Sequence, residues 1–454
     1  SRAVAALIEV LGDRVSTADS VRQHHGVDPS FHPGAPPDVV VFPRSTREVQ
    51  QVVRVCAGLR VPMIPFGAGT SLEGHVHALR GGVCIDLSAM TRIVRVSPED
   101  LDATVEAGVT REQLDRHLRD QGLFFPVDPG ANATLGGMAS TRASGTNAVR
   151  YGTMRDNVIA LRVVTPAGEI VDTARRARKS AAGYDLTRLL VGAEGTLGVI
   201  TEVTVRLHGI PEHQSAAVCA FEALGGAVDA VIETIQLGVP VARIELLDPL
   251  QIEACNRYSD LDNPVAPTLF FEFHGSARGV AEQVETVEAI CTEHGGQGFV
   301  WASDHMGRDR LWKARHDAYW AGLALRPGCR AMTTDVCVPI SRLTACVTET
   351  RADLDASGLF GPIVGHVGDG NFHVLLLLDP DDPAQLLEAE AFHARLVARA
   401  LAHDGTCTGE HGVGCGKIDF VEHELPGAVP LMRAIKHALD PHGLMNPGKV
   451  LRGT

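Results

Sequence analysis

The stretch Pro65-Phe-Gly-Ala-Gly-Thr-Ser-Leu-Glu-Gly74 directly follows a predicted strand, Val61–Phe66. Its glycines permit positive φ angles and a concave row of backbone N–H groups, an arrangement that binds phosphate. No Gly-Lys-Ser/Thr follows, so the stretch is not a P-loop, and its glycine spacing is not the GxGxxG of Rossmann folds. We therefore predict an anion-binding loop in a fold that belongs to neither of these classes.

Two later segments share this glycine-rich character. Residues 129–152 are rich in Gly, Ser, Thr and Asn, which makes them too small and polar for a core strand. They contain too many apolar residues for a disordered linker, and an ordinary long surface loop is the alternative. Gly192–Thr201 is a weak signal alone. One extended cofactor, contacted by several loops of one domain, explains all three segments together.

The length of the chain, 454 residues, exceeds what one hydrophobic core normally supports, so we expect two domains. Residues 36–208 mix short strands and amphipathic helices in an α+β pattern. Residues 215–302 have the order strand–helix–strand–strand–helix–strand, which suggests a ferredoxin-like antiparallel sheet. We place the domain limits at residues 1-208 and 209-410, followed by a C-terminal segment, 411-454.

Composition excludes several classes of function. The net charge of −14 argues against nucleic acid or an anionic membrane as an electrostatic partner. No apolar run approaches the roughly 20 residues needed for a membrane span. The 10 cysteines are scattered through mostly apolar segments without a CxxC pair, which indicates reduced core thiols and no iron–sulfur cluster. We expect a bacterial cytoplasmic protein, or a mitochondrial matrix protein if a eukaryotic targeting peptide has been removed.

The stretch His366-Val-Gly-Asp-Gly-Asn-Phe-His373 predicts a β-hairpin with Asp369-Gly370 as a two-residue type I′ turn. That turn would pair His366 with His373, with Cβ atoms about 4.5–5.5 Å apart, and Asn371 would share their face. Two histidines and a distant carboxylate, here Glu410, can form an open three-ligand metal site. A polar strand end with histidines bonded to backbone is the alternative.

The order of these motifs resembles the FAD-linked 2-hydroxyacid dehydrogenases of the vanillyl alcohol oxidase/p-cresol methylhydroxylase superfamily. Besides the three glycine-rich segments and the hairpin, the resemblance includes Thr408-Gly-Glu-His-Gly412 and Asn446-Pro-Gly-Lys449, and it covers essentially the whole chain. Thr333–Pro339 and Gly405–Gly412 are most similar to the subgroup that oxidises D-lactate. The resemblance implies a two-domain p-cresol methylhydroxylase-type FAD-binding fold with a ferredoxin-like antiparallel-sheet substrate domain, and a C-terminal segment that returns to the FAD domain.

The resemblance also implies which residues contact FAD. Binding would be non-covalent, because His75, the nearest residue for a covalent link, lies beyond the first loop rather than inside it. The expected contacts come from the three glycine-rich segments and the tail. They are Pro65, Gly67, Ala68, Gly69, Thr70, Ser71, Gly74, Pro129, Thr134, Gly137, Ser140, Gly145, Asn147, Tyr151, Gly152, Glu194, Gly198, Ile200 and Asn446.

For the reaction, the resemblance implies a divalent metal, Zn²⁺ or Mn²⁺, that binds the substrate oxygens, a histidine base, and an arginine that binds the substrate carboxylate. The α-hydrogen would pass as hydride to flavin N5. The residues assigned are His366, His373 and Glu410 for the metal, and His411, Arg315 and Asn371 for catalysis.

Two alternatives remain open at this site. His411 could be a metal ligand with Glu410 as the base, and both residues can serve one site only from an irregular loop. Arg315 could be an ordinary arginine on a surface helix.

The expected substrate is a small D-2-hydroxy acid, D-lactate in the first place, oxidised to pyruvate. The similar D-2-hydroxyglutarate dehydrogenases carry a lysine where this chain has Thr333-Thr334, which argues against a dicarboxylate. The sequence also leaves open the flavin subunit of a glycolate-oxidising complex, a flavin-independent metallohydrolase and a non-redox enzyme like the alkylglycerone-phosphate synthases. The chain has no haem motif, so electrons would leave to cytochrome c, a quinone or an electron-transfer protein. A homodimer is compatible with the sequence.

Overall fold

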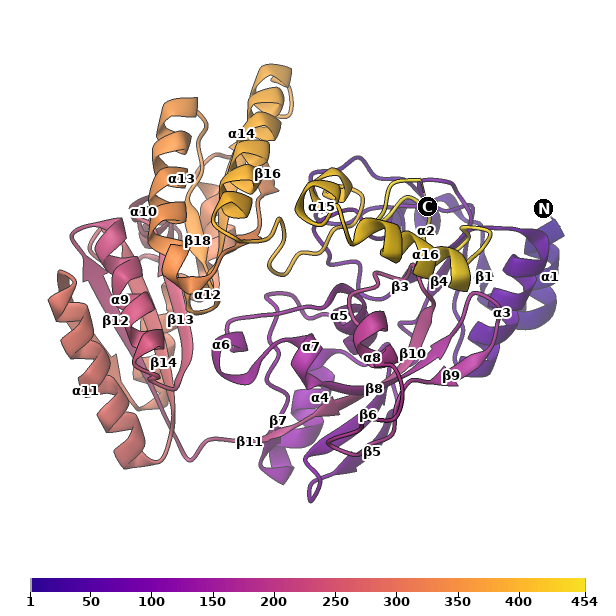
Figure 1. The fold of residues 1–454 in the computed structure, drawn as a ribbon, viewed down its shortest axis with the longest axis horizontal. Coiled ribbons are helices and arrows are strands. Elements are labelled where there is room, and N and C mark those ends of the chain that lie inside the picture. The colour runs from indigo at the N-terminus through magenta and orange to yellow at the C-terminus, as the bar shows by residue number, and fades with distance from the viewer. Residues whose placement is uncertain (1, 454) are drawn as a thin grey trace. The chain divides into compact units, whose positions relative to one another are not determined.

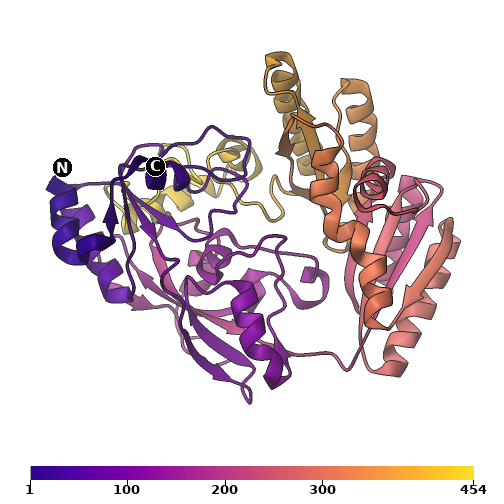
Figure 2. The same ribbon diagram turned by 180° about the vertical axis from the view of Figure 1, so that it is seen from behind.

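The computed structural model describes residues 2–453, which form two compact units (Figures 1 and 2). Unit 1 consists of Ser1–Gly145, Gly152–Ile210 and Glu410–Thr454. Unit 2 consists of the short segment Thr146–Tyr151 together with Pro211–Gly409. Along residues 2–453, no helix is both long enough and apolar enough to cross a membrane.

The first part of unit 1 is a four-stranded sheet in the order β1-β2-β4-β3, in which β2, β4 and β3 are parallel. Helices α1 and α3 pack against it through a shared apolar core. Ser45 caps the start of α3, because its side chain accepts a hydrogen bond from the Glu48 N–H. The elements are α1 (Arg2–Leu11), β1 (Val15–Ser16), α2 (Asp19–His24), β2 (Val39–Val41), α3 (Thr46–Leu59), β3 (Met63–Phe66) and β4 (Val83–Asp86).

The second part of unit 1 is a five-stranded antiparallel sheet in the order β5-β6-β10-β8-β9. Thr110 caps α4 with a capping box, and β8 and β9 form a hairpin. Helix α5 lies inside the glycine-rich residues 129–152 and contributes Leu135 and Met138 to the core. The elements are β5 (Ile93–Ser97), β6 (Asp102–Glu106), α4 (Arg111–Leu118), β7 (Leu123–Phe124), α5 (Leu135–Thr141), α7 (Met154–Asn157), β8 (Val158–Val164), β9 (Ile170–Asp172), α8 (Leu186–Leu190), β10 (Val199–Arg206) and β11 (His208–Gly209).

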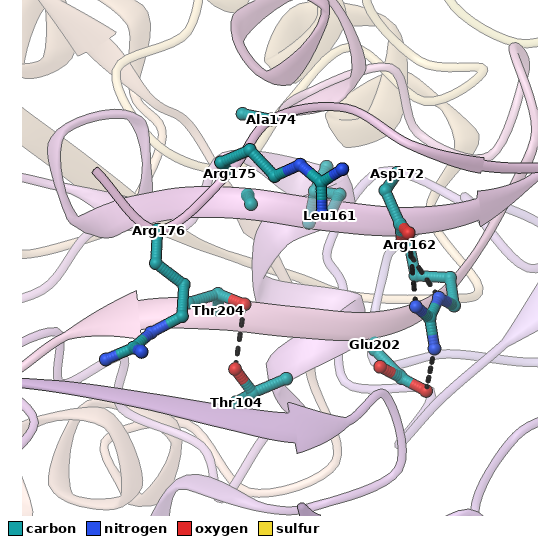
Figure 3. Close-up of a pocket in the computed structure, with 10 residues that line it drawn as sticks. Thr104, Leu161, Arg162, Asp172, Ala174, Arg175, Arg176, Glu202 and Thr204 are labelled. Carbon is teal, nitrogen blue, oxygen red and sulfur yellow. Dashed lines mark hydrogen bonds and ion pairs between the residues drawn. The ribbon is translucent and has the colours of Figure 1, made fainter. Parts of the chain in front are cut away.

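The outer face of this five-stranded sheet is polar and holds a shallow pocket of about 290 Å³ (Figure 3). Arg162 bridges the carboxylates of Asp172 and Glu202, at 2.8 and 3.0 Å, and the hydroxyls of Thr104 and Thr204 lie 3.0 Å apart. Because Arg162 is engaged by two carboxylates and the lining includes no histidine, cysteine or lysine, the pocket is a poor candidate for catalysis.

The C-terminal segment completes unit 1. Met445 forms an isolated bridge with Met63 of β3, and the Asn446 N–H donates to the Met63 carbonyl at 2.8 Å. The yellow segment lies beside β3 and β4 in both views (Figures 1 and 2). The tail therefore packs against the edge of the first sheet at β3. Its helices are α15 (Ile418–Glu424) and α16 (Val429–Leu439), the second with a proline in its first turn.

Unit 2 is built on an antiparallel sheet whose first four strands have the order β15-β12-β14-β13. Together with α9 and α11 on one face, these strands form the predicted ferredoxin-like arrangement, and α10 and α12 cover the other face. Strands β18, β19, β16 and β17 extend the sheet beyond β13.

The elements of unit 2 are α6 (Ala148–Tyr151), β12 (His213–Phe221), α9 (Leu224–Gln236), β13 (Val241–Leu247), α10 (Pro249–Ser259), β14 (Thr268–Gly275), α11 (Ala277–Glu293), β15 (Gly296–Ala302), α12 (His305–Ala324), β16 (Arg330–Thr333), β17 (Val336–Cys337), α13 (Leu343–Ser357), β18 (Ile363–Gly365), β19 (Asn371–Leu378) and α14 (Pro383–Ala402). The 10 cysteines of the chain are all free thiols, and most of them are buried.

Candidate active site

The hairpin that carries the two histidines differs from the predicted one. Strands β18 and β19 place Val364, not His366, opposite His373. The turn is longer than predicted: Val367–Asp369 form a 3₁₀ turn, and Gly370 follows with a φ of 79°. A two-residue type I′ turn requires a positive φ at Asp369 as well as at Gly370. Asp369 instead belongs to the 3₁₀ turn, so the predicted turn is wrong. Gly370 is needed here because a Cβ at this position would overlap the Val338 carbonyl oxygen.

The His366 and His373 side chains nevertheless meet. The difference in register is two residues, and side chains alternate along a strand with a period of two, so both rings stay on one face. The rings pack edge to face with centroids 5.6 Å apart. A ring nitrogen of His366 and one of His373 lie within 4.8 Å of each other. This spacing allows both imidazoles to bind one metal ion.

A buried carboxylate on β13 holds His366. The Nδ1 of His366 lies 2.8 and 3.0 Å from the two carboxylate oxygens of Glu245, and Arg315 Nε donates to the same carboxylate at 2.8 Å. Burial alone would raise the pKa of Glu245, but His366 and Arg315 outweigh it, and the pKa is lowered. A carboxylate that is ionised here only accepts hydrogen bonds, so the His366 Nδ1 donates.

His373 is held by backbone instead. Its Nδ1 donates to the Thr334 carbonyl at 3.0 Å, and Asp335 Oδ1 lies 3.6 Å away. Asp335 is fully buried; it accepts from Asn371 Nδ2 at 2.8 Å and from the Thr408 hydroxyl at 2.6 Å. The second Asn371 amide hydrogen reaches the Val336 carbonyl at 2.7 Å. The amide of Asn371 is therefore fixed by the protein, with its oxygen oriented away from Asp335.

Glu410 and His411 lie where the chain passes from one unit to the other. A Cβ at Gly409 would overlap the Asn371 amide nitrogen, so the backbone runs directly against Asn371 at the end of unit 2. Glu410 is the next residue. The His411 Nε2 lies 3.9 Å from Glu410 Oε1, and both side chains are largely buried. Residues 409–412 form neither helix nor strand, which is the irregular loop that a joint role for Glu410 and His411 requires.

Glu194 organises the turn that follows His411. It has a φ of 52° and accepts from the N–H groups of Val413 and Gly414 at 2.8 and 2.7 Å. His75 Nε2 lies 3.0 Å from the same carboxylate. Burial would raise the pKa of Glu194, but His75 and the two N–H groups lower it overall. Glu194 was expected to contact FAD, and in this structure its carboxylate binds protein groups.

The loop after β3 fits a bound pyrophosphate. Within residues 2–453, the N–H groups of Gly67 to Ser71 donate to no backbone carbonyl. Such a row of N–H groups is suited to phosphate oxygens. A Cβ at Gly67 would overlap the Thr134 hydroxyl, and one at Gly69 would lie 2.8 Å from the Phe66 ring, so the loop depends on glycine at both positions. The donor set and the close packing therefore suit the phosphates of FAD.

The tail contributes buried polar groups next to this loop. Asn446 Nδ2 donates to the carbonyls of His75 and Glu194, at 3.1 and 2.7 Å. Lys449 Nζ donates to the His77 carbonyl at 2.7 Å, and burial lowers the Lys449 pKa to about 8. These bonds attach the C-terminal segment to the chain that follows this loop and to Glu194.

Two of the residues expected at FAD belong to unit 2. Asn147 accepts from Arg243 Nε at 2.9 Å, and the Tyr151 hydroxyl lies 2.8 Å from His274 Nδ1. The others lie in unit 1: around the loop after β3, around α5, at the start of β10 and in the tail. These are Pro65, Gly67, Ala68, Gly69, Thr70, Ser71, Gly74, Pro129, Thr134, Gly137, Ser140, Gly145, Gly152, Glu194, Gly198, Ile200 and Asn446.

The sequence reasoning missed Glu245 and Asp335. Glu245 is the only carboxylate in the strand Val241–Leu247, and Asp335 follows two threonines next to β17. A single carboxylate within a buried strand needs a cationic or N–H partner, and this was the available signal. The identity of the partner could not be read from it.

Comparisons with known proteins agree with this fold. The family model described as the C-terminal domain of FAD linked oxidases matches residues 210–450, and an FAD binding domain model matches residues 37–174. The chain therefore belongs to the FAD-linked oxidase family, and it is an FAD-dependent oxidoreductase.

Individual relatives indicate which members of this family the chain resembles. The chain is 56% identical to "Probable D-lactate dehydrogenase, mitochondrial" of Danio rerio, over 100% of this chain and 92% of that protein. It is 49% identical to "D-lactate dehydrogenase [cytochrome], mitochondrial" of Arabidopsis thaliana, over 99% of this chain and 80% of that protein. A solved structure of p-cresol methylhydroxylase with substrate bound superposes with a TM-score of 0.81 at 18% identity, covering 99% of this chain and 96% of that one. The predicted p-cresol methylhydroxylase-type fold is confirmed.

Proposed function

We propose that this protein oxidises D-lactate to pyruvate, using non-covalent FAD and one divalent metal ion, and passes the electrons to an external acceptor. The relatives at 56% and 49% identity, both named as D-lactate dehydrogenases, support the substrate. The adjacent imidazoles of His366 and His373, each held through Nδ1 by a protein oxygen, are the structural observation that supports the metal.

We assign the metal to His366, His373 and Glu410. Because Nδ1 of each ring donates to a protein oxygen, Nε2 is the nitrogen that can bind the ion. Three protein ligands leave coordination positions for substrate oxygens, and this ligand set suits Zn²⁺ or Mn²⁺. When bound, the ion supplies Lewis acidity that lowers the pKa of the substrate hydroxyl.

Protein groups around this site bind the substrate carboxylate and accept the proton of the substrate hydroxyl. The guanidinium of Arg315 has its Nε held by Glu245, so its terminal nitrogens can bind the lactate carboxylate. His411 accepts the hydroxyl proton, a task for which imidazole is suited near neutral pH. The alternative assignment, in which His411 binds the metal and Glu410 is the base, would use the same irregular loop at residues 409–412. Asn371, whose amide is fixed by Asp335 and the Val336 carbonyl, lines the site on the face it shares with His373.

FAD supplies hydride acceptance at flavin N5 when it is bound. The residues of this chain hold and orient it: the N–H groups of Gly67 to Ser71 bind the phosphates, while Thr134 closes over Gly67. The other expected contacts of the glycine-rich segments would hold the rest of the cofactor. No residue inside the first loop offers a covalent link, which supports non-covalent binding.

The residues next to His373 support a small monocarboxylate. Thr334 lies at the site through its carbonyl bond to His373, and Thr333 precedes it on β16. Neither Thr333 nor Thr334 carries the cation that a second substrate carboxylate would need. D-Lactate fits this requirement, whereas D-2-hydroxyglutarate does not.

We further propose a mitochondrial location and a cytochrome as acceptor, because both relatives are named as mitochondrial and the plant enzyme also as cytochrome-linked. A quinone or an electron-transfer protein is the alternative acceptor.

The deciding experiment is an anaerobic titration of the purified protein, followed by the flavin absorbance. D-Lactate should bleach the flavin, while L-lactate, glycolate and D-2-hydroxyglutarate should act far more slowly. Treatment with EDTA should abolish bleaching, and added Zn²⁺ or Mn²⁺ should restore it. Faster bleaching by glycolate would assign the protein to glycolate oxidation, and a colourless protein would refute the flavin.

A further inference from the structure

We propose that Glu245 is a positioning residue that serves two parts of the active site at once. It sets the His366 ring for metal binding and it holds the Arg315 guanidinium for the substrate carboxylate. This inference rests on the proposed function and adds to it a residue that neither ligates the metal nor touches the substrate.

The sheet register places Glu245 where it can do this. Leu246 of β13 lies opposite Gly365 of β18, so the next position of this antiparallel ladder puts Glu245 opposite His366. Glu245 has no exposed surface. Its position is therefore set by strand pairing and burial, and not by a mobile loop.

The bond to Glu245 selects one tautomer of His366. Both carboxylate oxygens lie within 3.0 Å of Nδ1. Since a carboxylate accepts and cannot donate, the proton resides on Nδ1 and Nε2 carries the lone pair. A hydrogen-bonded carboxylate behind a metal-binding histidine fixes the ring orientation and makes the ring a better ligand.

The same carboxylate orients Arg315. The Arg315 Nε lies 2.8 Å from Oε2, and its side chain is 19% exposed. The guanidinium is planar, so a bond at Nε fixes the plane in which the terminal nitrogens lie. Glu245 therefore holds both the metal-binding ring of His366 and the carboxylate-binding guanidinium of Arg315. Their relative placement is fixed before the substrate binds.

A simpler explanation is that Glu245 only neutralises a buried arginine. The chain contains a matched control for this idea on the neighbouring strand β14. Glu272 also bridges a guanidinium and an imidazole, with Arg243 Nη1 at 3.1 Å and His274 Nε2 at 2.6 Å. Neither of these partners is assigned to the metal or to the substrate carboxylate. Glu272→Gln therefore removes a buried ion pair while leaving the contacts of Glu245 with His366 and Arg315 in place.

The test compares Glu245→Gln and Glu272→Gln in the full-length, FAD-loaded protein. Zn²⁺ affinity is measured by competition with a chromogenic chelator, together with the FAD-to-protein ratio and the KM for D-lactate. Glu245→Gln should weaken Zn²⁺ binding by about 10–100-fold, the usual effect of losing an outer partner of a ligand histidine, and should raise KM. Glu272→Gln should leave Zn²⁺ affinity unchanged.

Unchanged Zn²⁺ affinity in Glu245→Gln would overturn the inference, while bleaching of the wild type by D-lactate would still support the proposed function. A wild type that is bleached without holding any metal would overturn both the metal assignment and this inference.

Should Glu245→Gln fail to fold, Glu245→Asp retains the charge but retracts the carboxylate. In the Co²⁺-substituted protein, Glu245→Asp should alter the d–d absorption bands relative to wild type. Identical bands would count against a positioning role.

Discussion

The hydroxyl of Thr134 closes over the backbone of Gly67, so that a Cβ at residue 67 would overlap the Thr134 Oγ1. The same hydroxyl begins α5, where it accepts from the Gly137 N–H at 3.3 Å. One side chain thus connects the phosphate-binding loop after β3 with the helix inside the second glycine-rich segment. The two segments that were expected to share a cofactor are in direct contact.

Substitution of Gly67 by alanine tests this contact. The added methyl group must displace Thr134, which weakens the helix cap by about 1 kcal/mol and disturbs the loop. We expect FAD affinity to fall by more than about tenfold, or 1.4 kcal/mol, measured by fluorescence titration of the apoprotein. Gly130→Ala is the control, because a Cβ there meets nothing within 4 Å. Equal FAD affinity in the two variants would contradict the role of this contact.

His373→Gln should remove one metal ligand while leaving the hairpin in place. We expect loss of bound Zn²⁺ and a fall in kcat of more than about 100-fold, beyond the effect typical of outer partners. Metal analysis and steady-state rates measure the two effects. His294→Gln serves as control: His294 caps the end of α11 and pairs with Glu233 at 2.6 Å. Retention of stoichiometric metal in His373→Gln would refute the assigned ligand set.

Glu194→Gln should affect catalysis without removing the metal ligands. The amide would lose part of its bonding to His75, Val413 and Gly414, and the turn after His411 would loosen. Because small displacements of catalytic groups are costly, we expect kcat to fall on the order of 100-fold with normal metal content. Glu202→Gln, which affects an ion pair with Arg162 on the outer face of the sheet, should leave kcat unchanged. A normal kcat in Glu194→Gln would exclude this role.

Asp248 should make the stability of unit 2 depend on pH. Burial raises the pKa of this carboxyl to about 6, against an ordinary value of 3.8. The folded state therefore binds the proton more tightly, and its stabilising contribution is complete below pH 3.8 and is lost as pH rises through 6. The unfolding free energy of wild type minus that of Asp248→Asn should fall by roughly 2–3 kcal/mol from pH 4 to pH 7.

This difference is measurable by urea unfolding followed by tryptophan fluorescence. All three tryptophans, Trp301, Trp312 and Trp320, lie in unit 2 and report on its unfolding. Asparagine keeps an oxygen for the Gln251 N–H, so the cap of α10 is preserved. The exposed Asp262, replaced by asparagine, provides the reference. A pH-independent difference for Asp248→Asn would refute the prediction.

Several elements could be predicted because their signals are local. Ser45 and Thr110 mark helix starts through residues within one turn, and Pro430 marks the start of α16 in the same way. The ferredoxin-like order in unit 2 follows from the succession of strands and helices. The adjacency of His366 and His373 was also accessible, because both lie on one short hairpin and share a face even though the predicted register was two residues off.

The turn itself could not be derived from its own residues. Asp369-Gly370 favours a type I′ turn in isolation, but the chain around Gly370 packs against the Val338 carbonyl, and β19 also pairs with β17. The chain forms a 3₁₀ turn here because the backbone at Gly370 must fit against the Val338 carbonyl.

The sequence alone was therefore sufficient for the glycine loops, the family and the paired histidines, since these depend on residues close together in the chain or on ordered motifs. The environment of the histidines was accessible only in the folded structure. Glu245 lies 121 residues before His366 and 70 residues before Arg315, and strand pairing brings these groups together. Burial then fixes the orientation of these three side chains, because ionised groups removed from water must bond to one another.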